Sequence, residues 1–179
     1  FEPVPITDTF WVVPSWHEPP AQAQWVLRLD PGLAFGTGTH PTTRMCLRWI
    51  ATHAVTSQRV LDYGCGSGIL AIAAKKLGAS KVVGTDIDAQ AIQASLYNAE
   101  QNAVQASFYH ANDYQTEQHD IVVANILSSA LSVLAPALAK SCKTGGKIAL
   151  SGILKEQAEA VSAIYSPWFD MQAPVYMDA

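Results

Sequence analysis

The sequence predicts one α/β domain built on a doubly wound, mostly parallel sheet. From Arg59 onward, short apolar strands alternate with helical patterns, which is the order of elements in such sheets. A glycine-rich turn joins the first strand of this series to its first helix. The chain has 179 residues, of which 49% are hydrophobic, so it can bury one sizeable core. We expect residues 35–179 to form this domain and residues 1–34 to form a preceding β-hairpin and linker.

The N-terminal hairpin is predicted from two apolar and aromatic runs, 10–16 and 24–29. They flank a His-Glu-Pro-Pro sequence at 17–20, and proline-rich turns of this kind commonly join two strands. A flexible loop over 33–40 follows. The next helix, 41–53, begins with proline, which is favourable because its missing N–H would have no partner in the first turn.

The alternating part of the chain gives a second set of predicted elements. They are strand 59–63, helix 69–77, strand 81–85, helix 89–102, strand 107–110, strand 121–124, helix 129–139, strand 146–151 and helix 155–165. The run Ile121-Val122-Val123 is apolar throughout, as in a strand that is covered on both faces. Ile92, Leu96 and Ala99 recur at helical spacing, so we expect them to face the sheet. Residues 169–179 offer at most one more strand.

Charge and cysteine content argue against several classes of protein. The formal net charge is −4 and the pI is about 5.6, so the chain has no basic field to attract nucleic acid. Cys46, Cys65 and Cys142 are odd in number and lack the spacing of a zinc site, which favours reduced thiols in the cytoplasm. No apolar run approaches the roughly 18 residues that span a bilayer. We therefore expect a cytoplasmic protein without metal, membrane contact or direct nucleic-acid contact.

The glycine-rich turn indicates a nucleoside cofactor. Gly64, Gly66 and Gly68 alternate after the strand that carries Asp62, and glycine lets the backbone turn sharply and a ligand approach closely. A dinucleotide fingerprint would need glycine at position 69, which is Ile69. The spacing instead suits a cofactor with a nucleoside and an amino-acid arm but no pyrophosphate, and S-adenosylmethionine has that form. An ordinary turn between strand and helix is the alternative.

Acidic residues at the ends of the next two strands extend this prediction. Asp86 comes 22 positions after Gly64, where a carboxylate can accept hydrogen bonds from both ribose hydroxyls. Asp88 is expected to cap the following helix. Asp113, which follows the third strand, either accepts from the adenine amino group or belongs to an ordinary turn.

Three separated segments together resemble one family of enzymes. They are Phe-Gly-Thr-Gly-Thr-His-Pro-Thr-Thr at 35–43, the loop and helix at 62–73, and Asn-Ile-Leu at 125–127. They closely resemble the bacterial ribosomal-protein methyltransferases of the PrmA family. The resemblance implies a seven-stranded class I methyltransferase sheet, which is Rossmann-like, with S-adenosylmethionine as donor and S-adenosylhomocysteine as product. It also implies methylation of lysine and N-terminal amines on a large-subunit ribosomal protein.

Two departures from the family pattern accompany this resemblance. The family's N-terminal domain, which grips the ribosomal protein, is not expected within these 179 residues, and the sheet is expected to lack its last strand, leaving an open edge. Two other functions stay open. One is a methyltransferase that acts on nucleic acid or a small-molecule amine, and the other is a non-catalytic module that binds the cofactor.

Asn125 is the residue that we expect at the reacting amine, and we expect it to contact the cofactor as well. It ends a central strand on its carboxyl side, where ligands gather in such sheets, and its amide oxygen can accept a hydrogen bond from an amine without adding charge. A plain turn residue that ends a strand is the alternative.

The resemblance also implies cofactor contacts before the sheet begins. It assigns them to Thr43 and to the loop residues Phe35, Thr37, Gly38 and Thr39, which would close over the methionyl arm. A mobile connector with a helix cap is the alternative. His40 is expected either to touch substrate or to cap and pack near Pro41.

Overall fold

The computed structural model describes residues 2–30, 40–53 and 55–176. Its central sheet has five strands in the order β6-β5-β4-β7-β8, all of them parallel. The strands are β4 (Arg59–Tyr63), β5 (Lys81–Asp86), β6 (Ser107–His110), β7 (His119–Asn125) and β8 (Cys142–Ser151). The helices are α1 (Pro41–Thr52), α2 (Ile69–Lys76), α3 (Ala89–Gln101), α4 (Ser128–Lys140) and α5 (Ala158–Tyr165), with a short 3₁₀ turn η1 (Lys155–Gln157) before α5.

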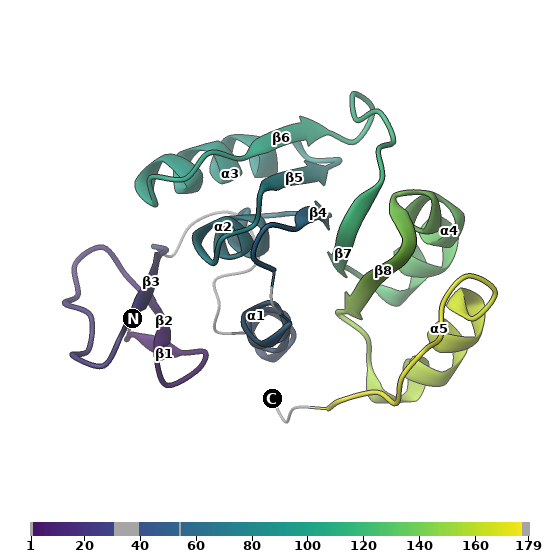
Figure 1. The fold of residues 1–179 in the computed structure, drawn as a ribbon, viewed down its shortest axis with the longest axis horizontal. Helices are drawn as coiled ribbons and strands as arrows, with labels where there is room; N and C mark the ends of the chain where they lie inside the picture. Colours follow the sequence, from purple (N-terminus) through teal and green to yellow (C-terminus); the bar gives the residue numbers. More distant parts are fainter. Residues whose placement is uncertain (1, 31–39, 54, 177–179) are drawn as a thin grey trace.

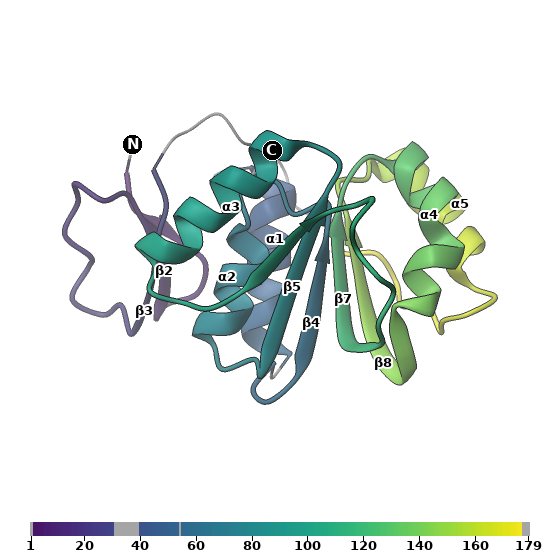
Figure 2. The same ribbon diagram turned by 90° about the horizontal axis from the view of Figure 1, so that it is seen from above.

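Helices cover both faces of the sheet, which confirms the doubly wound α/β prediction. Figure 2 shows α1, α2 and α3 on one face and α4 and α5 on the other. Successive residues of a strand serve opposite faces: Val60 belongs to the core under α1–α3, and Leu61 belongs to the core under α4 and α5. The apolar run 121–123 is fully buried between these layers, as predicted.

The strand order reverses beside β4. The chain leaves β4 for β5 and β6 on one side and then crosses back to β7 and β8 on the other side (Figure 1). In doubly wound sheets, ligands bind at such a switch point, outside the carboxyl ends of the neighbouring strands. Every predicted site residue that the structure describes lies at or next to this edge of the sheet.

The N-terminal segment forms a separate small sheet with a pairing that differs from the predicted one. β1 (Val4–Pro5) and β2 (Phe10–Val13) form an antiparallel hairpin, whereas β3 (Trp25–Arg28) pairs with β2 in parallel. The two apolar runs are therefore strands, but they are not the two arms of one hairpin. The connection over 14–24 is long enough to return the chain to the same end of the sheet, which allows parallel pairing.

The C-terminal part also differs from the seven-stranded expectation. A seven-stranded sheet without its last strand would have six strands, but the described residues form five, and residues 169–176 form none. This segment contains Pro174 and runs extended along α5 instead of joining the sheet (Figure 1). β8 is therefore the edge strand on this side.

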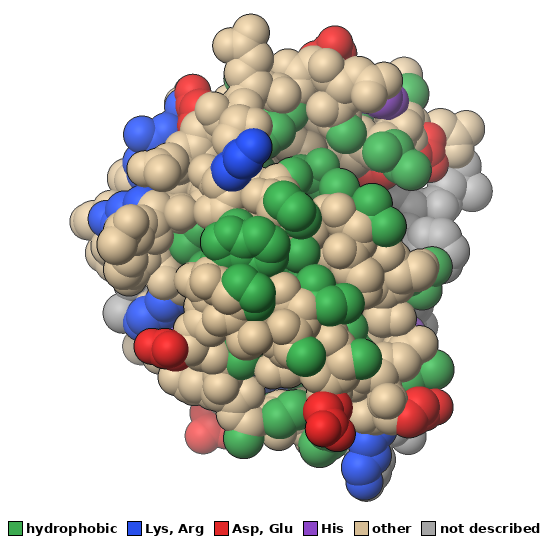
Figure 3. Space-filling view, turned by 90° about the vertical axis from the view of Figure 1, so that its right-hand side faces the viewer, with side chains coloured by type: hydrophobic (Ala, Val, Ile, Leu, Met, Phe, Trp, Pro, Cys, Tyr) green, Lys and Arg blue, Asp and Glu red, His purple; other side chains and the backbone are tan. Residues whose placement is uncertain are grey.

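The outer side of α4 and α5 carries exposed apolar side chains. Figure 3 looks onto this side and shows them grouped with few charges among them. Val133 on α4 is 80% exposed, and Trp168, just after α5, is 50% exposed. None of these residues belongs to the predicted site. Within the described ranges, no helix has the length and apolar character needed to cross a lipid bilayer.

Candidate active site

The glycine loop adopts a conformation that only glycine tolerates well. Gly64 and Gly68 have φ angles of +78° and +81°, in the left-handed region. A Cβ at Gly64 would collide with the side chain of Ile126, and one at Gly68 would lie 2.9 Å from Ser95. The N–H groups of Gly64 and Cys65 both donate to the carbonyl of Thr85 at 2.8 Å. The loop is thus hydrogen-bonded to β5 and packs against α3 and against Ile126, the residue that follows β7.

Asp86 holds this loop from the end of β5. One carboxylate oxygen accepts the N–H of Gly66 at 2.9 Å and the other accepts the N–H of Asp88 at 3.0 Å. Each oxygen keeps a second lone pair, so the partly buried carboxylate can still accept from two neighbouring hydroxyl groups. This arrangement fits the ribose that the sequence predicts for this position. Asp88 caps α3 as expected, since its side chain accepts the N–H of Gln90.

Asp62 is a buried carboxylate below the loop. It is 1% exposed and accepts the N–H of Ala71, in the first turn of α2, at 3.2 Å. Burial raises the pKa of Asp62 to about 7, the hydrogen bond from Ala71 opposes this rise, and the negative charge of Asp86 adds to it. A cation placed against Asp62 would stabilise its ionised form, which suits the ammonium of an amino-acid arm.

Two residues of α3 that sequence reasoning missed hold the glycine loop from behind. The Ser95 hydroxyl donates to the carbonyl of Gly66, and the Asn98 amide donates to the carbonyl of Ser67, both at 2.9 Å. The predicted inner face of α3 was partly wrong, because Leu96 is 51% exposed while Ser95 is fully buried. Short polar side chains three positions apart on α3, the helix after the next strand, are the signal that could have found this pair.

Asn125 and Thr43, which the sequence assigns to different parts of the site, contact each other directly in the structure. The Asn125 amide nitrogen donates to the Thr43 hydroxyl at 3.2 Å. Thr43 is 2% exposed in the first turn of α1, and Asn125 is partly buried at the end of β7. Thr43 thus contacts Asn125, the residue that is predicted to lie at the reacting amine.

The remaining predicted residues have different outcomes. His40 caps α1, because its ring Nδ1 accepts the N–H of Thr42 at 3.2 Å, which matches the capping alternative. Asp113 is exposed in the turn after β6, where its N–H donates to the carbonyl of His110. His110 is the ladder partner of Asp86, so this turn starts at the same edge of the sheet. Phe35, Thr37, Gly38 and Thr39 lie outside the described residues.

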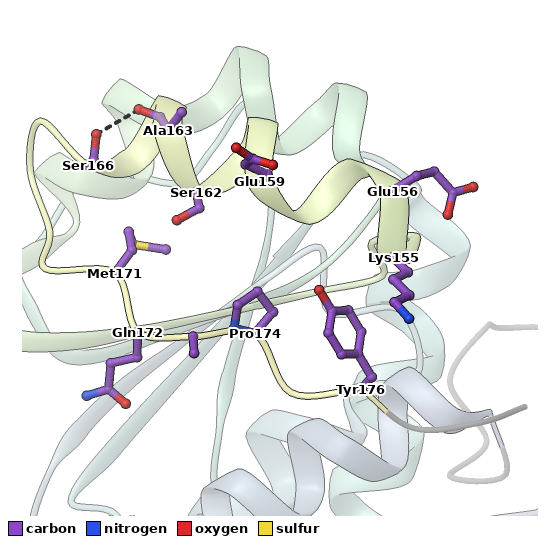
Figure 4. Close-up of a pocket in the computed structure, with 11 residues that line it drawn as sticks. Lys155, Glu156, Glu159, Ser162, Ala163, Ser166, Met171, Gln172, Pro174 and Tyr176 are labelled. Carbon is purple, nitrogen blue, oxygen red and sulfur yellow. Dashed lines mark hydrogen bonds between the residues drawn. The ribbon is translucent and has the colours of Figure 1, made fainter.

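The described residues offer neither a metal cluster nor a disulfide at this site. No group of three or more His, Cys, Asp or Glu side chains in these ranges could hold a metal ion, and all three cysteines are free and buried. A groove of about 880 Å³ lies elsewhere, between α5 and residues 171–176 (Figure 4). It contains none of the predicted site residues, and the ammonium of Lys155 lies 5.4 Å from the centre of the Tyr176 ring at its end.

The fold and the site define a class of protein. A parallel doubly wound sheet with an alternating glycine loop after β4, a carboxylate after β5 and an asparagine after β7 is the arrangement of a Rossmann-like methyltransferase domain. The chain matches the family model described as "Ribosomal protein L11 methyltransferase (PrmA)" over residues 1–178. It belongs to this family.

Curated relatives and solved structures agree with this assignment. The ribosomal protein L11 methyltransferases of Methylobacillus flagellatus and Chromobacterium violaceum are 67% and 58% identical, over 100% and 98% of this chain. The chain spans 61% and 59% of their lengths. The crystal structure of a ribosomal protein L11 methylase from Lactobacillus delbrueckii subsp. bulgaricus is 32% identical with a TM-score of 0.84, covering 97% of this chain and 94% of that one. A T. thermophilus 16S rRNA methyltransferase, RsmC, shares the fold at 22% identity with a TM-score of 0.64, covering 76% of this chain and 40% of that one.

Proposed function

We propose that the whole protein transfers methyl groups from S-adenosylmethionine to lysine and N-terminal amines of a large-subunit ribosomal protein. Ribosomal protein L11 is the substrate that the relatives' names indicate. The observation that carries the proposal is the pairing of two half-sites at one edge of the sheet. The glycine loop with Asp86 forms a cofactor half, and the neutral amide of Asn125 lies at the end of β7, next to β4 in the sheet.

The cofactor half is assigned from hydrogen-bonding capacity. Asp86 would accept from the two ribose hydroxyls, and the glycine loop would lie along the nucleoside and the methionyl arm. Asp62 would face the ammonium of that arm, and Asp113 would accept from the adenine amino group. When bound, the cofactor supplies a methyl group made electrophilic by its sulfonium.

The acceptor half is assigned from the chemistry of amines. In an in-line displacement, the nitrogen lone pair forms a bond to the methyl carbon while the carbon–sulfur bond breaks and sulfur keeps its electron pair. The methylated nitrogen then loses a proton to solvent. A lysine with pKa near 10.4 is neutral only about once in a few thousand at pH 7. The uncharged amide of Asn125 would orient the neutral amine without stabilising its ammonium form.

Charge and thiol state support a protein substrate in the cytoplasm. The net charge of −4 provides no general attraction for nucleic acid. The three cysteines are free and buried, as expected in a reducing compartment. We therefore propose that the partner is the ribosomal protein and that the enzyme makes no direct contact with rRNA or membrane.

The test is methylation by the full-length protein with purified L11 and, separately, with naked rRNA. Mass spectrometry of L11 peptides should show added methyl groups on lysine or N-terminal nitrogens, and the rRNA should stay unmodified. Calorimetry should show binding of S-adenosylmethionine by the same preparation. Binding without transfer to L11 would reduce the proposal to a cofactor-binding module, and transfer to rRNA would replace the substrate.

A further inference from the structure

The hydrogen bond between α1 and β7 decides which end of the Asn125 amide faces the site. Asn125 and Thr43 are 82 positions apart in the chain, and the amide nitrogen of Asn125 donates to the Thr43 hydroxyl at 3.2 Å. Among the described residues, none donates to the amide oxygen of Asn125. The NH₂ end is thus engaged with α1, and no residue that the structure describes uses the acceptor capacity of the oxygen.

The orientation matters because the two ends of an amide have opposite hydrogen-bonding roles. An oxygen that faces an amine accepts one of its N–H groups and leaves the nitrogen lone pair available. An NH₂ group in the same place would donate to that lone pair and occupy the electrons that must attack the methyl carbon. The two orientations differ by a half-turn of one side-chain torsion, so a neighbouring group has to select one of them.

We propose that Thr43 is a positioning residue that holds the Asn125 amide with its oxygen toward the acceptor amine. Thr43 acts through Asn125 and needs no contact with the substrate. The proposal rests on methyl transfer to an amine as the function of the site. It gives Thr43 a role in addition to the cofactor contact implied by the family resemblance.

Thr43 is suited to this role because its own position is fixed. It is 2% exposed, and its branched Cβ limits the rotation of the hydroxyl. The first turn of α1 is tied to the neighbouring strand, since the hydroxyl of Ser151 donates to the carbonyl of Thr42 at 3.4 Å. Ser151 is the ladder partner of Asn125, so the first turn of α1 and the end of β7 share one anchor.

Substitutions at Thr43 in the full-length enzyme test the proposal. Thr43→Val has nearly the same shape but no acceptor, whereas Thr43→Ser keeps the hydroxyl. We expect Thr43→Val to lower kcat about ten-fold, the loss of one oriented hydrogen bond, with cofactor Kd changed less than about three-fold. Thr43→Ser should recover most of the lost turnover. In an Asn125→Ala background, Thr43→Val should cause no further loss of kcat, because the effect of Thr43 on turnover passes through Asn125.

Each other outcome overturns a definite statement. A wild-type kcat in Thr43→Val would exclude a positioning role. So would a double variant whose loss of kcat is the product of the losses in Thr43→Val and Asn125→Ala, because the two residues would then act independently. A Kd that rises in step with the loss of kcat would make Thr43 a cofactor contact only. Thermal unfolding of each variant, Thr43→Ala included, shows whether the protein remains folded. Failure of the wild-type enzyme to methylate any amine would instead overturn the proposed function and leave the hydrogen bond as a structural link.

Discussion

At the scale of single residues, the carboxyl groups of Asp62 and Asp86 differ in burial and in hydrogen bonding. Asp86 is partly buried and accepts one backbone N–H on each oxygen, and Asp62 is almost fully buried with a pKa raised to about 7. Near neutral pH, Asp62 can therefore change its charge when a ligand arrives. Two predictions follow from this difference.

Cofactor binding at pH 6 should release a proton from Asp62. The carboxyl is mostly protonated at that pH in the free protein, and a ligand ammonium beside it would lower its pKa and favour ionisation. Asp62→Asn cannot release this proton. Calorimetric titrations in two buffers with different ionisation enthalpies measure the number of protons released. Equal numbers for the wild type and Asp62→Asn would show that the ammonium lies elsewhere.

Asp86→Ala should weaken cofactor binding by roughly 1–3 kcal/mol, because it removes the acceptor of two ligand hydroxyls and of the Gly66 N–H. The matched control is Asp88→Ala, which removes an exposed helix cap and leaves Asp86 in place. Binding of S-adenosylmethionine by all three proteins is measured by calorimetry. Unchanged affinity in Asp86→Ala would contradict the ribose assignment.

At the scale of elements, α3 shows where sequence patterns succeed and where they stop. Its bounds, Ala89–Gln101, are within one residue of the predicted 89–102. Hydrophobic spacing selected Leu96 for the inner face, but that face meets the glycine loop, where the small polar Ser95 donates a hydrogen bond to the Gly66 carbonyl. A pattern of apolar residues contains no information about a polar partner, and only the packed fold supplies it.

Ser95→Ala should therefore weaken both the protein and the site. It removes the hydroxyl that donates to Gly66, so we expect a loss of about 1 kcal/mol in the free energy of unfolding and weaker cofactor binding. Leu96→Ala on the exposed neighbouring position is the control and should stay within about 0.5 kcal/mol. Denaturant unfolding and calorimetry measure the two quantities. A larger loss of stability in Leu96→Ala than in Ser95→Ala would show that Leu96 faces the sheet, as the spacing predicts.

At the scale of the whole molecule, the parallel direction of the central strands and the edge that carries the site follow from the sequence. Alternating elements imply a parallel sheet, and a parallel sheet brings Asp86 and Asn125 to one edge. The parallel pairing of β2 with β3 did not follow, since the turn between the two apolar runs favoured an antiparallel hairpin. The contact of Thr43 with Asn125 did not follow either, because it spans 82 positions and depends on how α1 packs.

Stability of the cofactor-free protein should depend on pH through two buried groups with opposite effects. The pKa of Asp62 is raised to about 7 in the folded protein. Its contribution to the free energy of unfolding is therefore fully present below about pH 4 and is lost as the pH rises through 7. His119, at the start of β7, is fully buried, and burial lowers its pKa to about 4. Its contribution is present above about pH 6.5 and is lost as the pH falls to 4.

Separate substitutions should expose the two slopes between pH 4.5 and 6.5. Asp62→Asn leaves the His119 effect, so its free energy of unfolding should rise with pH. His119→Gln leaves the Asp62 effect, so its free energy should fall with pH, and the wild type should change less than either. Denaturant unfolding at several pH values measures all three, and parallel curves would contradict both assignments.

The end of α3 also decides what the small N-terminal sheet can pair with. The N–H of Arg28 on β3 donates to the side-chain oxygen of Asn102 at 2.7 Å, and the side-chain nitrogen of Asn102 donates to the Arg28 carbonyl at 2.8 Å. These are the two bonds that a further strand would make at this residue. Asn102, 4% exposed, thus acts as a one-residue substitute for a neighbouring strand. It closes an edge that would otherwise be a template for intermolecular β-pairing, and so protects the chain against edge-to-edge aggregation at this point.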